Sequence, residues 1–185
     1  MTNTTRERQE KLATWLRHLI ETIRLHGGET WEALVQIVSG KTAAIALDGT
    51  TLQVSAEGGD NLQLHFEYTV PPDSINFISN GNTLRDIVAG RLTVDGAIAN
   101  GRIYARDNLD ELLGIYEVLM RILADSATNP ELQEQWMEFD QSWPGSATGG
   151  LPSLLEGQKP LYGYFIDSVP EDVLEIEVEP YLVDE

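Results

Sequence analysis

The sequence predicts an α+β domain in which helices cover a mainly antiparallel sheet. Residues 7–25 and 108–124 repeat apolar side chains at intervals of three and four, as one face of a helix does. Between them, residues 43–70 alternate apolar and polar side chains with the period of two that a strand requires. Strands that lie between two groups of helices leave one apolar sheet face, and we expect helices to cover it.

Two helices open the chain. The first, residues 7–25, has a clean apolar face and ends at two glycines, which adopt the left-handed cap conformation without strain. The second spans residues 30–39. Asp48-Gly49 signals a tight hairpin between the first two strands. We expect successive strands to pair antiparallel, and we place them at 43–47, 52–56, 62–70 and 74–79.

The next stretch, residues 82–124, contains the strongest pattern in the chain. We expect a short helix at 83–89, a compact connection over 91–100 and a last strand at 101–106. A long helix follows at 108–124. Asn108 is placed to accept hydrogen bonds from the first-turn amides, and Glu111 is placed to reach back toward it, as in a capping box.

The helix at 108–124 is apolar on more than one face. Only four of its positions, Asp110, Glu111, Glu117 and Arg121, mark a polar side. Such a helix must be covered on two flanks. The sheet is expected to cover one flank, and a second element, a partner chain or an apolar ligand is expected to cover the other.

The character of the chain changes after residue 126. We expect a domain over residues 1–126, including the helix at 7–25, and an extension over 127–185. The extension contains a predicted helix beginning at Asn129-Pro130, a Gly/Pro-rich linker, and an acidic C-terminal segment. Apolar residues alternate with glutamates in that segment, so it is either an edge strand or a tail that orders on a partner.

Charge and composition exclude several classes of partner. The net charge is −18, and residues 125–185 hold fourteen acidic residues against one basic residue. This balance repels phosphate backbones, so nucleic acid is not expected as a partner. No apolar run approaches the ~20 residues that span a bilayer, so no stable membrane insertion is expected. The chain has no cysteine and no visible secretory signal, and we expect a cytoplasmic protein.

No pattern for catalysis, cofactors or metals was found, and we expect a protein that is not an enzyme. The sequence lacks a nucleophile elbow, a dinucleotide-binding glycine motif and a P-loop. Its three histidines have no metal-ligand spacing. Basic residues gather in one stretch, at Arg85, Arg91, Arg102, Arg106 and Arg121. They are either a rim for a lipid head group or partners of nearby carboxylates.

The order of these elements resembles the sterol carrier protein 2 (SCP2-like) lipid-transfer family. The residues that carry the resemblance are Thr83, Leu84, Ile87 and Gly90, then Ala97, Ile98 and Gly101-Arg102-Ile103, then Leu109 through Leu123. The resemblance covers roughly residues 30–124. It implies a five-stranded sheet and an apolar tunnel between sheet and helices that holds a fatty acyl chain, a sterol or another lipid without chemistry.

The resemblance assigns a lining to that tunnel. The residues expected to line it are Leu64, Phe66, Phe77, Ile87, Ile98, Ile103, Leu112, Tyr116 and Leu119. Burial of a C16 chain there would contribute on the order of 10 kcal/mol before costs. Alternatively, these side chains fill the core. The chain would then be a module for homodimerisation or protein–protein interaction, with the acidic C-terminal segment as an arm.

Overall fold

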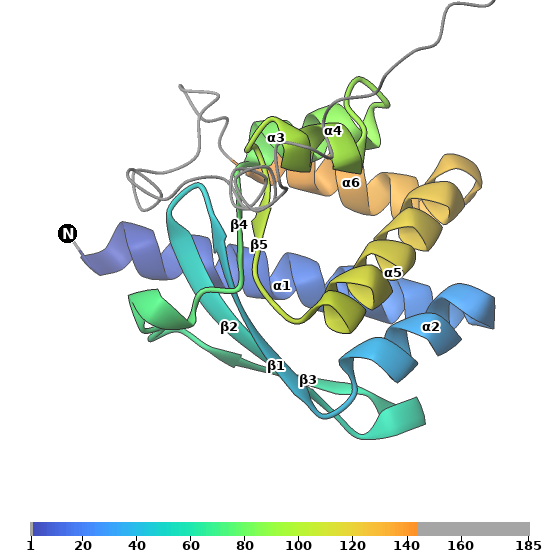
Figure 1. Cartoon of the computed structure of the whole chain (residues 1–185), viewed down its shortest axis with the longest axis horizontal. Helices are drawn as coiled ribbons and strands as arrows, with labels where there is room; N and C mark the ends of the chain where they lie inside the picture. The colour runs from blue at the N-terminus through green and yellow to red at the C-terminus, as the bar shows by residue number, and fades with distance from the viewer. Residues whose placement is uncertain (1, 144–185) are drawn as a thin grey trace, which may run out of the picture. The chain divides into compact units, whose positions relative to one another are not determined.

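The computed structural model describes residues 2–143, with side chains from residue 4 onward. All of these residues belong to one compact unit. The helices of this part are α1 (Thr2–His26), α2 (Gly28–Val38), α3 (Gly81–Val88), α4 (Val94–Ala99), α5 (Leu109–Thr128) and α6 (Pro130–Ser142). The strands are β1 (Lys41–Leu47), β2 (Thr50–Glu57), β3 (Gln63–Glu67), β4 (Phe77–Ser79) and β5 (Tyr104–Ala105). The described residues therefore form an α+β fold (Figure 1).

The five strands form one mixed sheet in the order β3-β2-β1-β4-β5. Three of the four pairings are antiparallel, but β1 and β4 run parallel, with Ile45 opposite Phe77. The expectation that the fourth strand continues an antiparallel meander was wrong. β2 occupies only one edge of β1, and the chain crosses back after β3 to use the other edge. Asn76 fixes the start of this pairing, because its backbone and side chain both hydrogen-bond to Ala44.

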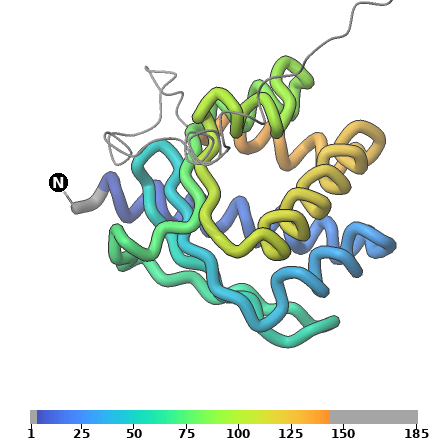
Figure 2. The backbone as a smooth tube through the Cα atoms, viewed as in Figure 1, coloured from blue at the N-terminus to red at the C-terminus, as the bar shows by residue number. Residues whose placement is uncertain are grey.

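The expected cover of the sheet by the long helix also needs correction, because α1 provides the cover. α1 packs against β2 and α6, whereas α5 packs against α2 and α6. Figure 2 follows the chain from α1 at its start to α6, which returns to lie against α1. Leu12 of α1 and Leu52 of β2 are almost fully buried in the same core cluster. The helix that packs most extensively on the strands is therefore α1 and not α5.

Local capping residues explain where the later helices begin. The Asn108 side chain accepts a hydrogen bond from the Glu111 amide at 3.0 Å, which confirms the predicted N-cap of α5. The Glu111 carboxylate pairs with Lys41 instead of turning back to the cap. The expected connection at 91–100 contains a helix, α4, which sequence reasoning missed. Thr93 caps it by accepting from the Gly96 amide at 3.0 Å.

The helix predicted after Asn129 is α6, and it belongs to the core. Asn129 caps it by accepting from the amides of the first turn. Aromatic contacts join it to α1, since the rings of Trp15 and Trp136 lie 5.2 Å apart and those of Trp15 and Phe139 lie 4.8 Å apart. The predicted linker and acidic segment lie outside the described residues, and the boundary at 126 stays a prediction.

Candidate functional site: an apolar cavity

A cavity of about 270 Å³ lies between the sheet and the helices. Its walls come from α1, from strands β1, β4 and β5, and from helices α3, α4, α5 and α6. Figure 1 shows how these elements are arranged. Every residue that lines the cavity is hydrophobic. Residues of α1 and α5 both line this cavity, and α5 packs on α2 and α6.

Most of the residues expected to line a tunnel meet in this one cavity. Those brought together are Phe77, Ile87, Ile98, Ile103, Leu112, Tyr116 and Leu119. They come from five separate elements and loops between residues 77 and 119, and their apolar faces converge because β4 and β5 pair beneath α3, α4 and α5.

Two expected lining residues, Leu64 and Phe66, lie elsewhere. Both belong to β3, which pairs only with β2 at the far edge of the sheet. Phe66 packs against the core and stacks under the Arg17 guanidinium at 4.9 Å. The alternation that turns both residues toward the covered face was predicted correctly. Their distance from the cavity follows from the strand order, which puts β2 and β1 between them and β4.

Sequence reasoning missed the contribution of the first and last helices. Leu12, Trp15, Leu16 and Leu19 of α1 line the cavity, and so does Trp136 of α6. The signal was present in the clean apolar stripe of residues 7–25. Nothing local in the sequence shows which part of a helix face meets a hollow.

The lining offers no free polar side-chain atom. Its three side chains with a polar atom already have partners. Trp15 Nε1 donates to the Gln135 carbonyl at 3.0 Å, Trp136 Nε1 donates to Ser126 Oγ at 2.9 Å, and Tyr116 Oη donates to Asp95 Oδ2 at 3.0 Å. Such a lining favours apolar atoms and provides no group for acid–base or nucleophilic chemistry.

The cavity opens between α4 and α5. Ile98, Ile115 and Leu119 line the cavity and are also exposed, by 43%, 41% and 36%. A side chain that does both lies at an opening. Tyr116 stands in the same stretch, with its ring in the lining and its hydroxyl on the exposed carboxylate of Asp95. The Tyr116–Asp95 hydrogen bond therefore joins α5 to α4 at this opening.

The five arginines singled out in the sequence do not line the cavity. Four of them form ion pairs: Arg85 with Asp140, Arg91 and Arg102 with Asp86, and Arg121 with Glu117 and Glu29. Hydrogen bonds from Arg102 and then from Arg91 hold the pKa of Asp86 below its ordinary value. Of the two readings of these arginines, the contacts favour carboxylate pairing for these four.

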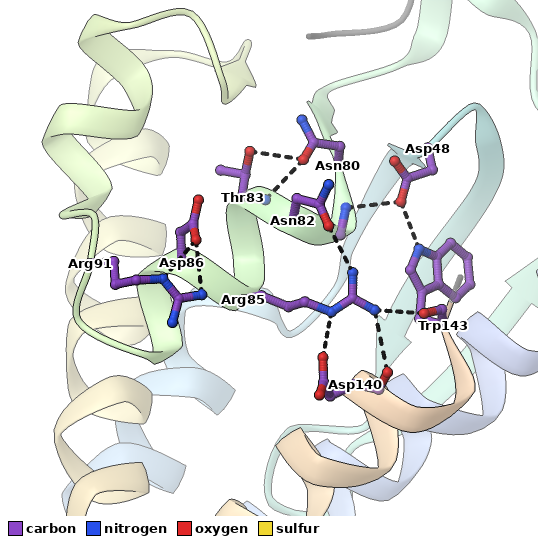
Figure 3. A network of polar contacts seen from close by, with 10 residues as sticks. Asp48, Asn80, Asn82, Thr83, Arg85, Asp86, Arg91, Asp140 and Trp143 are labelled. Atoms are coloured by element: carbon purple, nitrogen blue, oxygen red, sulfur yellow. Dashed lines mark hydrogen bonds and ion pairs between the residues drawn. The ribbon is translucent and has the colours of Figure 1, made fainter. Parts of the chain in front are cut away.

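Arg85 and Asp48 hold α3 and α6 together (Figure 3). Both helices line the cavity, and we call this pair of helices its roof. Arg85 donates to Asp140 Oδ1 at 2.6 Å and to the Trp143 carbonyl at 2.6 Å, which holds the end of α6 against α3. Asp48 Oδ2 accepts from Trp143 Nε1 at 2.7 Å and from the Gly81 amide at 2.9 Å. The β1–β2 turn, the start of α3 and the end of α6 thus meet at one carboxylate.

A wider groove of about 570 Å³ lies outside this roof, between α3, α5 and α6. Arg85, Arg91 and Asp140 contribute to its polar side, and Met137 to its apolar side. Over residues 2–143, no three histidine, aspartate or glutamate side chains are grouped to hold a metal ion. In that same part of the chain, no helix has the length and apolarity needed to cross a bilayer.

Comparisons with known proteins add no assignment. No family model matches the sequence, and neither a curated protein nor a solved structure matches it significantly. The resemblance to the SCP2-like family therefore stays an expectation. The function has to be argued from the cavity itself.

Proposed function

We propose that this protein binds a small apolar ligand non-covalently in the cavity between its sheet and helices. The observation that carries the proposal is a hollow whose lining is almost entirely apolar and whose few polar side-chain atoms are already hydrogen-bonded. Dry apolar cavities take up apolar molecules, because the molecule leaves water and gains close contacts with the walls. The helix α5, which is apolar on more than one face, and the resemblance to a lipid-transfer family support the same proposal.

The volume suggests the size of the ligand. An engineered cavity of about 150 Å³ takes up benzene, so 270 Å³ corresponds by proportion to roughly ten carbon atoms. This favours the end of an acyl or alkyl chain over a complete sterol nucleus. Burial of ten methylene groups contributes about 8 kcal/mol before the costs of association, so the Kd should be no tighter than about 1 µM.

Decan-1-ol and the two tryptophans in the lining provide a direct test. Because Trp15 and Trp136 contact the cavity, a bound chain should shift their fluorescence in a saturable titration. Ala105→Phe should abolish this binding, because Ala105 lines the cavity and the larger side chain occupies it. The matched control is Ala43→Phe, since Ala43 is an exposed strand residue outside the lining.

Three outcomes can be distinguished once circular dichroism and urea unfolding show that both variants are folded. Saturable binding by the wild type and by Ala43→Phe, together with its loss in Ala105→Phe, supports the proposal. Absence of binding in the wild type contradicts it. Equal binding by both variants shows that the chain lies elsewhere and also contradicts it.

A second candidate function, association with another chain, is favoured by the outer side of α5. Leu109 and Leu113 are exposed by 70% and 58%, and Met120 by 43%, yet none of them lines the cavity. Contiguous exposed apolar side chains often mark a protein–protein contact. Sedimentation of the wild type and of Leu113→Glu tests this candidate. If this surface self-associates, the wild type sediments as an oligomer and Leu113→Glu sediments as a monomer.

A further inference from the structure

One lining side chain, Tyr116, hydrogen-bonds to a carboxylate, that of the exposed residue Asp95. Inside the cavity, the indole N–H groups of Trp15 and Trp136 already donate hydrogen bonds to other groups of the protein. The head group of any ligand with an apolar tail must therefore remain at the opening, where it can keep contact with water. The group that meets it there is the Tyr116–Asp95 pair, because Tyr116 lines the cavity and Asp95 is exposed.

Asp95 keeps acceptor capacity at that opening. Its Oδ2 atom accepts from the Tyr116 hydroxyl, and within residues 4–143 no other hydrogen bond or ion pair engages this carboxylate. An ionised carboxylate offers two oxygens and about four acceptor positions. A hydroxyl group arriving at the opening can therefore donate a charge-assisted hydrogen bond to Asp95 without displacing Tyr116.

Among the described residues, none of the five arginines between positions 85 and 121 forms an ion pair with Asp95. Arg85, Arg91, Arg102 and Arg121 are engaged by other carboxylates. Arg106 follows Ala105, which lines the cavity, and its amide continues the ladder by donating to the Asn76 carbonyl. Since successive side chains of an extended segment point to opposite faces, Arg106 is directed away from the cavity.

We propose that the ligand of this cavity carries an uncharged hydroxyl head group, and that Asp95 selects it by repelling carboxylate heads. This inference rests on the proposed function and names the chemical class of its ligand. A carboxylate head about 4 Å from Asp95 is disfavoured by about fivefold even at the dielectric constant of water, and more strongly where the protein excludes solvent. The hydroxyl could come from an alkanol or from another neutral lipid, and the shared feature is an uncharged donor on an apolar chain.

The test compares decan-1-ol with decanoate at a pH where decanoate is ionised. Decanoate is the more soluble probe and is expected to bind more weakly to any apolar site, so the ratio of the two Kd values in one protein does not decide the question. The decisive quantity is the change in that ratio on Asp95→Asn. The substitution removes the charge but keeps an amide oxygen that can accept from Tyr116.

One variant serves as the control. Asp60→Asn removes an equal charge from the turn between β2 and β3, on the far side of the sheet order from β4 and β5. At low ionic strength we expect Asp95→Asn to narrow the ratio of the two Kd values about fivefold, and Asp60→Asn to leave it within twofold of the wild type.

The outcomes of this test are distinct from those of the cavity test. A ratio that Asp95→Asn leaves unchanged overturns the head-group inference while decan-1-ol binding, and with it the proposed function, remains intact. A ratio that Asp60→Asn narrows equally shows a general charge effect and also overturns the inference. Failure of the wild type to bind either probe removes the proposed function and the inference together. Added salt should reduce the effect of Asp95, because exposed charges are screened.

Discussion

We expect the side chain of Asp48 to contribute more than any other to the stability of the roof of the cavity, formed by α3 and α6. It is the first residue of the Asp48-Gly49 turn, and its φ of 49° lies in the left-handed region that most side chains disfavour. Its Oδ2 atom accepts from Trp143 Nε1 and from the Gly81 amide (Figure 3). Removal of this carboxylate therefore acts on the turn, on α3 and on α6 at once.

The expected loss can be worked out from these contacts. Each hydrogen bond to the charged oxygen contributes at least about 1.5 kcal/mol, and both donors belong to buried residues. Asp48→Ala loses both bonds and adds about 1 kcal/mol for alanine in the left-handed region. We expect its free energy of unfolding to fall by about 4 kcal/mol. Asp48→Asn keeps one oxygen for both donors and tolerates the same backbone angle, so it should lose only about 1 kcal/mol.

Urea unfolding followed by tryptophan fluorescence measures these differences, with the slope of the transition checked for constancy. Asp60→Ala is the control, because it removes a carboxylate from another turn, and within residues 4–143 no hydrogen bond depends on that carboxylate. We expect it to change the free energy of unfolding by less than about 0.5 kcal/mol. If Asp48→Ala is as stable as Asp60→Ala, or Asp48→Asn loses as much as Asp48→Ala, the account of Asp48 as a shared acceptor is wrong.

Two further predictions concern pH. The hydrogen bond to Asp95, together with burial, raises the pKa of Tyr116 above its ordinary value of about 10, so the stability it contributes is lost as pH rises through the folded pKa. The pH titration of the six tyrosines, followed by ultraviolet difference absorbance, should show one tyrosine that ionises at a lower pH in Asp95→Asn than in the wild type. Identical titration curves for the two proteins would argue against this hydrogen bond in solution. Because Arg102 and Arg91 lower the pKa of Asp86, its stabilisation should be complete above about pH 4 and decline as pH falls toward the folded pKa. The difference in urea midpoint between wild type and Asp86→Asn should therefore shrink on acidification, whereas a constant difference would contradict the pairing.

Local patterns in the sequence determined the elements and much of the lining. The 3.6-residue period located α1 and α5, and the side-chain amides of Asn108 and Asn129 marked where α5 and α6 begin. Asp48-Gly49 forms the predicted β1–β2 hairpin, with both residues at positive φ. These features depend on residues within about four positions of each other, so the printed order of side chains is enough to specify them.

The tertiary structure decided how those elements face one another. Only long-range pairing places β4 parallel to β1, which brings Phe77 to the cavity and leaves Phe66 at the far edge. Only long-range packing, of α5 on α2 and α6 and of α6 on α1, positions α5 so that a hollow remains beside the strands. A periodic pattern states that a face is apolar. Whether that face meets a side chain, a void or solvent is set by contacts between residues distant in the chain, and no local rule encodes them.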